Sequence, residues 1–165
     1  RQLLRPYRKP LIVFTPKSLL RLPASVSTLH ELAEGAFQPV LAPTGCDAEA
    51  VETILLCSGR IYFDLENRRA GRADCAIVRI EQFYPFPDVE LKQVLDSFPN
   101  AREMRWVQDE PQNQGAWRYM AFHLRQVSSL PIRYVGRPES ASPATGYQQM
   151  HKAQLEGILH DAFPA

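Results

Sequence analysis

The sequence predicts a three-layer, Rossmann-like α/β domain with a mostly parallel sheet of about five strands. Short apolar runs bounded by glycine and proline are typical of strands. Segments with helical apolar spacing separate these runs through the second half of the 165-residue chain. Each such helix is long enough to cross from one parallel strand to the next. Strands that alternate with helices in this way indicate helices on both faces of a parallel sheet.

The first predicted strand is residues 11–15, a run of leucine, isoleucine, valine, phenylalanine and threonine between Pro10 and Pro16. A continuous apolar run, rather than an alternating one, is typical of a strand covered on both faces. We therefore expect residues 11–15 to lie inside a sheet.

A short helix is expected at residues 29–33. Thr28 suits its N-cap, Glu31 stands three residues later as a capping box requires, and Gly35 follows the end. A short edge strand is expected at residues 38–41.

The remaining elements alternate regularly along the chain. Between residues 88 and 98 the apolar side chains Leu91, Val94, Leu95 and Phe98 share one helical face. In the last helix six side chains are expected to point inward, namely Tyr147, Met150, Leu155, Ile158, Leu159 and Ala162. The predicted strands are 53–57, 75–80, 103–107 and 132–135, and the predicted helices are 61 to about 71, 88–98, 116–127 and 145–162.

The charge is unevenly distributed although the net charge is only +1. The first acid in the chain is Glu31, and residues 1–10 form a basic connecting arm of an otherwise single domain, residues 1–165. Such a basic cluster can bind a phosphate, contact an acidic neighbour or simply be solvated, and the charge pattern does not decide among these three alternatives. The candidate residues for a phosphate-bearing effector are Arg5, Arg8, Lys17, Ser18 and Arg21.

Several function classes lack their sequence signals. No apolar run approaches the length of a membrane span, and basic residues are not interleaved with aromatics as a nucleic-acid platform needs. The three cysteines have no Cys-x-x-Cys spacing, which indicates reduced, structural thiols. The four histidines follow no metal-ligand spacing, and no Gly-x-Ser-x-Gly elbow is present. We expect no membrane, no nucleic acid, no metal and no catalytic residue in this chain.

The polar stretch at residues 108–117 (QDEPQNQGAW) joins a predicted strand to a predicted helix. Ligands and partner subunits bind at this edge of α/β sheets. Asp109 and Glu110 could form an acid–base pair, but adjacent residues point apart and no nucleophile accompanies them. A structural or subunit-contact role is favoured, and the candidate interface residues are Glu110, Asn113, Gln114 and Trp117. Ser58 and Gly59 also follow a strand, where a plain tight turn is favoured over a phosphate site.

Four ordered blocks resemble the C-terminal domain of the thiamine-dependent decarboxylating component of 2-oxoglutarate dehydrogenase. They are residues 8–21 (RKPLIVFTPKSLLR), 76–87 (AIVRIEQFYPFP), 108–117 (QDEPQNQGAW) and 136–147 (GRPESASPATGY). The likeness covers nearly the whole chain. Asp109 departs from it, because the family pattern has glutamate there.

The resemblance implies a transketolase-like fold and a place at the C-terminal end of a much longer subunit. It implies that thiamine diphosphate and Mg²⁺ lie in the preceding domains and that the isolated fragment holds no cofactor and is inactive. The implied reaction decarboxylates 2-oxoglutarate and succinylates the lipoyl group of a dihydrolipoyl acyltransferase. The implied partners are the preceding domains, a second subunit of a homodimer and that acyltransferase, in the bacterial cytoplasm or the mitochondrial matrix.

Three roles remain open for the fragment itself. The first is to complete the subunit and extend its dimer contact. The second is a regulatory module that binds AMP or acetyl-CoA through the basic N-terminal cluster. The third is a purely structural interaction domain. Related subunits that act on 2-oxoadipate share much of the pattern, so the substrate depends on the preceding domains.

Overall fold

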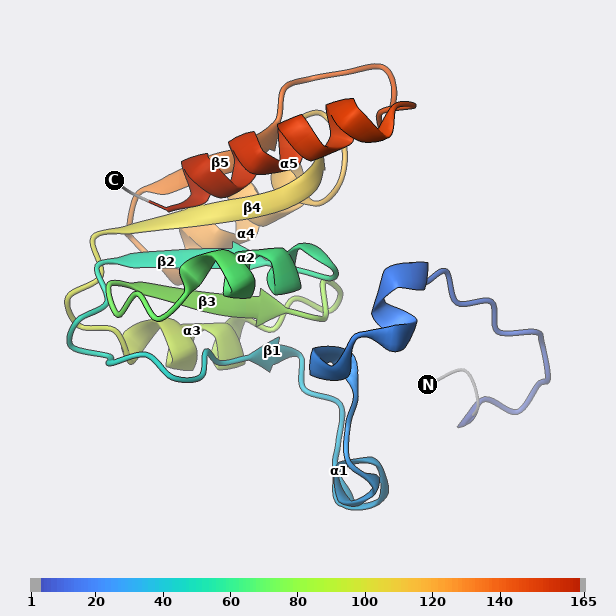
Figure 1. Cartoon of the computed structure of the whole chain (residues 1–165). Coiled ribbons are helices and arrows are strands. Elements are labelled where there is room, and N and C mark those ends of the chain that lie inside the picture. Colours follow the sequence, from blue (N-terminus) through green and yellow to red (C-terminus); the bar gives the residue numbers. More distant parts are fainter. Residues whose placement is uncertain (1–3, 164–165) are drawn as a thin grey trace. The chain divides into compact units, whose positions relative to one another are not determined.

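A computed structural model describes residues 4–163 of the chain. Residues 1–3, at the start of the basic arm expected from the sequence, lie outside the described residues. The chain divides into two compact units with a boundary between Ala36 and Phe37 (Figure 1). We call them the N-terminal unit and the main unit and describe each separately.

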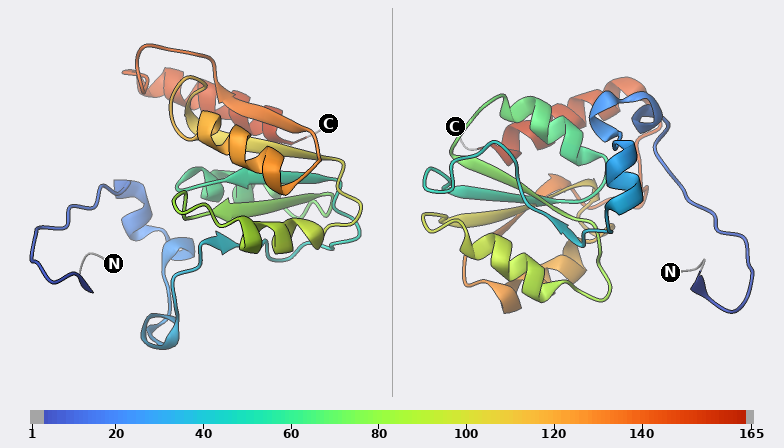
Figure 2. Two further views of the ribbon diagram at one scale, coloured as in Figure 1. Left: turned by 180° about the vertical axis from the view of Figure 1, so that it is seen from behind. Right: turned by 90° about the horizontal axis from the view of Figure 1, so that it is seen from below.

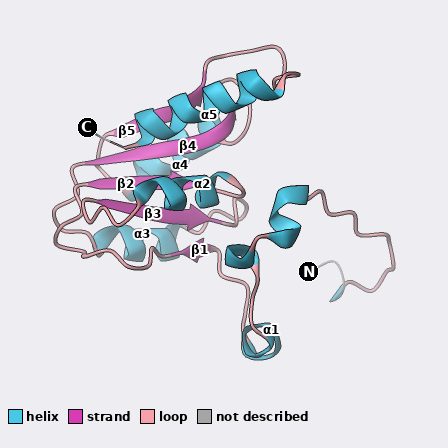
Figure 3. Cartoon of the chain, viewed as in Figure 1, coloured by secondary structure: helices cyan, strands magenta, loops and turns pink. Residues whose placement is uncertain are grey.

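The main unit contains a five-stranded sheet in the order β1-β3-β2-β4-β5, drawn in magenta in Figure 3. Strands β2, β3, β4 and β5 are parallel, whereas the two-residue β1 pairs antiparallel with β3 at one edge. The expected fold class, with its mostly parallel sheet, is confirmed. The strands are β1 (Val40–Leu41), β2 (Thr53–Cys57), β3 (Cys75–Ile80), β4 (Glu103–Pro111) and β5 (Ile132–Arg137).

Two helices cover each face of this sheet. α2 (Ile61–Arg69) and α5 (Gln148–Ala162) lie in front of it in Figure 1, and α3 (Asp88–Asp96) and α4 (Trp117–Val127) cover the opposite face, seen from behind in Figure 2. The buried side chains accordingly form two clusters, one on each side of the sheet. The result is the predicted three-layer arrangement.

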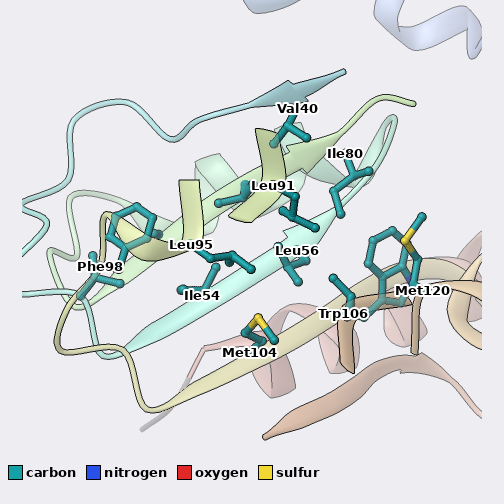
Figure 4. Close-up of a cluster of buried hydrophobic side chains, with 14 residues drawn as sticks. Val40, Ile54, Leu56, Ile80, Leu91, Leu95, Phe98, Met104, Trp106 and Met120 are labelled. Carbon is teal, nitrogen blue, oxygen red and sulfur yellow. The ribbon is translucent and has the colours of Figure 1, made fainter. Parts of the chain in front are cut away.

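The larger cluster lies between the sheet and the helices α3 and α4 (Figure 4). Leu91 and Leu95 of α3 point toward Ile54 and Leu56 of β2, and the ring of Trp106 lies beside them, 1% exposed. Burying each such side chain contributes about 1.5–3 kcal/mol. The apolar spacing of residues 88–98 therefore predicted the correct inward face.

The N-terminal unit contains a short helix, α1 (Leu29–Glu34), with the predicted capping box. The Glu31 backbone N–H donates to Thr28 Oγ1 at 3.2 Å, and the Thr28 N–H donates to Glu31 Oε2 at 2.7 Å. These hydrogen bonds from Thr28 hold the pKa of Glu31 below its ordinary value. Gly35 is the C-cap, as predicted.

The predicted strand at residues 11–15 is wrong for this structure, because these residues form no secondary structure. Phe14 is 96% exposed and Ile12 is 75% exposed, and within the described chain no residue of the run has a backbone hydrogen bond. A strand requires a neighbouring backbone, and apolar composition alone does not supply one. Two short 3₁₀ segments follow instead, η2 (Lys17–Arg21) and η3 (Pro23–Ser25).

Several element boundaries differ from the prediction. β1 covers only the last two of the expected residues 38–41, β5 continues from residue 135 to Arg137, and α5 begins at Gln148 and not at residue 145. β4 continues through Gln108 to Pro111, because the end of β4 pairs with Arg137 of β5 across a register shift. Tyr147 precedes α5 and is 76% exposed, and Met150 in its first turn is 51% exposed, so neither points inward as expected. The fully buried side chains of α5 come only in its last two turns. No helix in residues 4–163 combines the length and apolar character needed to cross a membrane.

Candidate functional site

The carboxyl ends of β2 and β4 meet at the switch point of the sheet. β2 leads through α2 to β3 on one side, whereas β4 leads through α4 to β5 on the other. In open α/β sheets the crevice at such a point is where ligands bind. The side chains at this edge therefore determine what the main unit can do.

An ion-pair bridge joins α2 to β4 at this edge of the sheet. Arg60, in the turn after β2, reaches Asp64 of α2 and Asp109 of β4, with N–O distances of 2.7 Å to each carboxylate. Burial raises the pKa of Asp64 and the Asp109 charge adds to this, while the Arg60 guanidinium opposes it. One oxygen of Asp109 is buried without a hydrogen-bond partner. Because Arg60 pairs with both carboxylates, the geometry is that of a structural ion-pair bridge and not of an acid–base pair.

Gln108 organises the turn between β4 and α4. Its side chain is buried, and Gln108 Oε1 accepts hydrogen bonds from Trp106 Nε1 at 2.8 Å and from the Trp117 backbone N–H at 3.0 Å. Its amide nitrogen donates to three backbone carbonyls, those of Glu110 at 3.2 Å, Pro111 at 3.1 Å and Gln114 at 2.8 Å. One buried amide thus accepts from the Trp106 indole and the Trp117 backbone N–H and donates to the carbonyls of the turn.

Gly115 is required by the same turn. Its φ is +64°, a left-handed conformation that side chains rarely adopt. A Cβ at this position would lie 2.9 Å from Gln108 Nε2 and 3.0 Å from Glu110 Cβ. Gly115 is therefore required for the backbone conformation of this turn and for its close packing against Gln108.

The candidate interface residues Asn113 and Gln114 hold a neighbouring loop of the same chain. Asn113 Nδ2 and Gln114 Nε2 donate to the Ser140 carbonyl at 3.0 and 2.8 Å, and the Ser140 N–H donates back to Asn113 Oδ1 at 3.0 Å. The Tyr134 hydroxyl lies within hydrogen-bond distance of the Glu110 and Arg137 carbonyls, at 3.0 and 2.8 Å, and shares its one proton between the ends of β4 and β5. Burial raises the pKa of Tyr134 to about 12. These amides stabilise the edge from within the chain.

The other two interface candidates differ in exposure. Glu110 is exposed and lies near the end of β4. Trp117 is half-buried, with its ring centroid 5.3 Å from that of Tyr134. The structure places all four candidates at the turn between β4 and α4 or on the strand and helix beside it, and among the four only Glu110 carries a charge.

The phosphate candidates lie in the N-terminal unit. Lys17, Ser18 and Arg21 share the segment η2, and the three-residue spacing of Ser18 and Arg21 places them on one side of a 3₁₀ helix. Arg5 lies over the ring of Tyr7 at 5.9 Å. All five candidates are exposed, and within the described chain Arg5, Arg8, Lys17 and Arg21 form no ion pair.

Sequence reasoning missed a buried arginine at the end of β5. Arg137 is 7% exposed, and its Nη2 lies 2.8 Å from Nδ1 of His151 on α5. His151 in turn interacts electrostatically with Asp64. The available signal was the block 136–147, in which this arginine follows the last strand.

The cysteines do not supply a nucleophile at this edge. Cys57 and Cys75 are fully buried in β2 and β3. Burial raises the pKa of the Cys57 thiol far above its ordinary value and that of Cys75 to about 11. Both remain protonated thiols at neutral pH, which agrees with their predicted structural role. Among residues 4–163, no three His, Cys, Asp or Glu side chains group as metal ligands.

The main unit has a three-layer α/β fold like that of transketolase domains. A solved split-gene transketolase, described as an inactive β4 tetramer, has the same fold with a TM-score of 0.54 at 12% identity, over 76% of this chain and 41% of that one. The pattern of the 2-oxoglutarate dehydrogenase C-terminal family matches residues 26–163, and the chain belongs to that family.

Curated relatives agree with this assignment. The chain is 50% identical to the 2-oxoglutarate dehydrogenase E1 component of Azotobacter vinelandii and 45% identical to that of Haemophilus influenzae, over 99% and 98% of its length. It spans only 18% of the length of each of these relatives. The family and fold expected from the four sequence blocks are therefore confirmed.

Proposed function

We propose that this chain is the C-terminal part of a 2-oxoglutarate dehydrogenase E1 subunit. The observation that supports it best is 50% identity over 99% of the chain to an E1 component of which the chain spans 18%. The whole subunit would decarboxylate 2-oxoglutarate and pass a succinyl group to the lipoyl arm of a dihydrolipoyl acyltransferase. The bacterial relatives favour the cytoplasm as its compartment over the mitochondrial matrix.

Thiamine diphosphate and Mg²⁺ would belong to the preceding domains. Mg²⁺ takes oxygen ligands, largely from carboxylates and phosphates, and no such group of ligands occurs within residues 4–163. The two carboxylates at the switch point already pair with Arg60. The described residues do not fit this cofactor, so no step of the reaction is assigned to them.

The role of the main unit would be to complete the subunit and extend its homodimer contact. Its carboxyl edge is built for rigidity, since Gln108, Asn113 and Gln114 fix two adjacent loops by hydrogen bonds. A pre-ordered surface loses little conformational entropy on docking. Glu110 and Trp117 would make the contacts of this surface with the preceding domains or with the second subunit.

An activity assay tests this proposal. The full-length subunit, given thiamine diphosphate and Mg²⁺, is expected to decarboxylate 2-oxoglutarate with ferricyanide as electron acceptor, because the cofactor supplies the electron sink. The 165-residue chain, assayed identically, is expected to show no turnover. Turnover by the short chain, or a full subunit that prefers 2-oxoadipate, would contradict the proposal.

A second candidate function is the binding of AMP or acetyl-CoA by the basic cluster. It is favoured by the exposed positive charges of Arg5, Arg8, Lys17 and Arg21, which have no acidic partner within the described residues. Ser18 would add a hydroxyl donor to a phosphate.

Calorimetric titration of the full subunit measures this binding directly. Arg8→Ala is expected to weaken the binding of a phosphate-bearing effector about tenfold, because one charge-assisted hydrogen bond is lost. Arg102→Ala, at an exposed arginine of the main unit, is the matched control and is expected to leave the affinity unchanged. Absence of binding by the unmodified subunit at millimolar AMP and acetyl-CoA would count against this function.

A further inference from the structure

Residues 11–15 expose apolar side chains in both directions. Leu11 is 57% exposed, Ile12 75%, Val13 71% and Phe14 96%. Successive side chains of an extended chain point to opposite sides, so neither side of this run is polar. Scattered exposed apolar residues are ordinary, but a contiguous apolar stretch indicates an interaction surface.

The backbone of this run is also unpaired. Within the described chain none of its peptide groups takes part in a backbone hydrogen bond. Its β-branched and aromatic residues are those favoured in strands. Pro10 and Pro16 stand at its two ends, where the missing N–H groups limit a strand to the five residues between them, about 17 Å of extended chain.

The family boundary separates this run from the main unit. The family pattern begins at residue 26, whereas identity to the E1 components extends over 99% of the chain. Residues 11–15 are thus part of the subunit but precede the C-terminal domain that the family describes. About four-fifths of each of these relatives lies beyond the 18% that the chain spans.

We propose that residues 11–15 form a strand in the sheet of the domain that precedes the main unit. The proposal rests on the proposed function, because it takes the E1 subunit as the source of that domain. A strand with two apolar faces needs cover on both, so the receiving sheet carries helices or loops on each side. The run would dock by strand addition, with main-chain hydrogen bonds supplying the pairing.

Amide hydrogen exchange distinguishes the paired from the unpaired run. In the full-length subunit the amides of Ile12, Val13 and Phe14 are expected to exchange at least about a hundredfold more slowly than in the 165-residue chain. Equally fast exchange in both would overturn the proposal. Slow exchange in both would also overturn it, because the run would then find its partner within these 165 residues.

Proline substitutions test the same pairing by stability. Alternate N–H groups of an edge strand face its neighbour, so of Ile12→Pro and Val13→Pro at least one removes a pairing donor. At least one is expected to lower the melting temperature of the full subunit by several degrees, and neither should change that of the 165-residue chain. Two variants without effect in the full subunit would overturn the proposal.

The hydrogen-exchange result and the activity assay test the two proposals independently. A subunit that protects residues 11–15 but decarboxylates a different 2-oxo acid would refute the proposed substrate and leave the strand assignment standing. A subunit active on 2-oxoglutarate with fast exchange at residues 11–15 would refute the strand assignment alone.

Discussion

Gln108→Leu is expected to lower the free energy of unfolding by about 3–5 kcal/mol. The leucine would leave the buried Trp106 Nε1–H and the Trp117 N–H without their acceptor. It would also remove the Gln108 donor from the Gln114 carbonyl, whereas the Glu110 and Pro111 carbonyls keep the Tyr134 hydroxyl and the Gln114 N–H. A buried polar group left without a partner costs about 1–3 kcal/mol, which makes loss of the whole set larger than a typical substitution. Urea denaturation followed by far-ultraviolet circular dichroism measures the change.

A matched control separates the buried amide from the general effect of exchanging glutamine for leucine. Gln93 is exposed on α3, so Gln93→Leu should change the free energy of unfolding by no more than about 0.5 kcal/mol. A loss below about 1 kcal/mol for Gln108→Leu would show that water replaces the missing partners.

Gln108→Glu gives the same prediction a pH dependence. The carboxylate would face three carbonyl oxygens, so its pKa in the folded protein would lie above that in the unfolded protein. When the pKa is higher in the folded than in the unfolded protein, the folded state binds the proton first. The free energy of unfolding therefore rises as the pH falls into the range where this carboxyl is protonated. Gln108→Glu should therefore recover stability between neutral pH and about pH 5, whereas Gln108→Leu should not.

The sequence predicted the elements whose stability is local or patterned. Residues 53–57 and 75–80 were predicted with the observed bounds because continuous apolar runs of that length fit strands buried on both faces. The capping box at Thr28 and Glu31 was predicted because its two hydrogen bonds join residues three apart. The capping box depends on no distant partner, and the two strands pair directly with each other.

Features that depend on pairing at a distance were missed. Residues 11–15 have the composition of a strand, but pairing requires a second backbone that composition cannot locate. The extension of β4 to Pro111 depends on Arg137 of β5, which the polar character of residues 108–111 concealed. The local sequence thus indicates which segments favour an extended backbone, and the neighbouring strand in the fold determines which of them pair.

The candidate site shows the same division. The turn at residues 108–117 was identified from its position between a strand and a helix, but the importance of Gln108 was not, since it depends on burial beside Trp106. The pairing of Arg60 with Asp109 joins residues 49 positions apart. No spacing rule relates such residues before the order of the strands is known.

The buried thiols of Cys57 and Cys75 should destabilise the main unit at alkaline pH. Burial raises the pKa of both in the folded protein, while the unfolded chain titrates near the ordinary value of about 8.5. A thiol whose pKa is higher in the folded than in the unfolded protein stabilises the folded state fully below the unfolded pKa. This contribution to the free energy of unfolding is lost as the pH rises toward the folded pKa. Each thiol contributes a slope of about 1.4 kcal/mol per pH unit, so the two together should remove about 4 kcal/mol between about pH 9 and pH 10.5.

Single substitutions identify the thiols as the cause of this slope. Cys57→Ala should lower the free energy of unfolding at neutral pH by about 1–2 kcal/mol through loss of packing, yet roughly halve its decline above about pH 9. Cys75→Ala should do the same, except that its own contribution ends near the pKa of about 11 that burial gives this thiol. The remaining decline above pH 10 belongs partly to Tyr134, whose pKa is raised to about 12, so Tyr134→Phe should flatten only that range. Urea denaturation at a series of pH values measures these slopes, and a slope unchanged in both cysteine variants would show that the thiols ionise in place or that alkaline unfolding begins elsewhere in the chain.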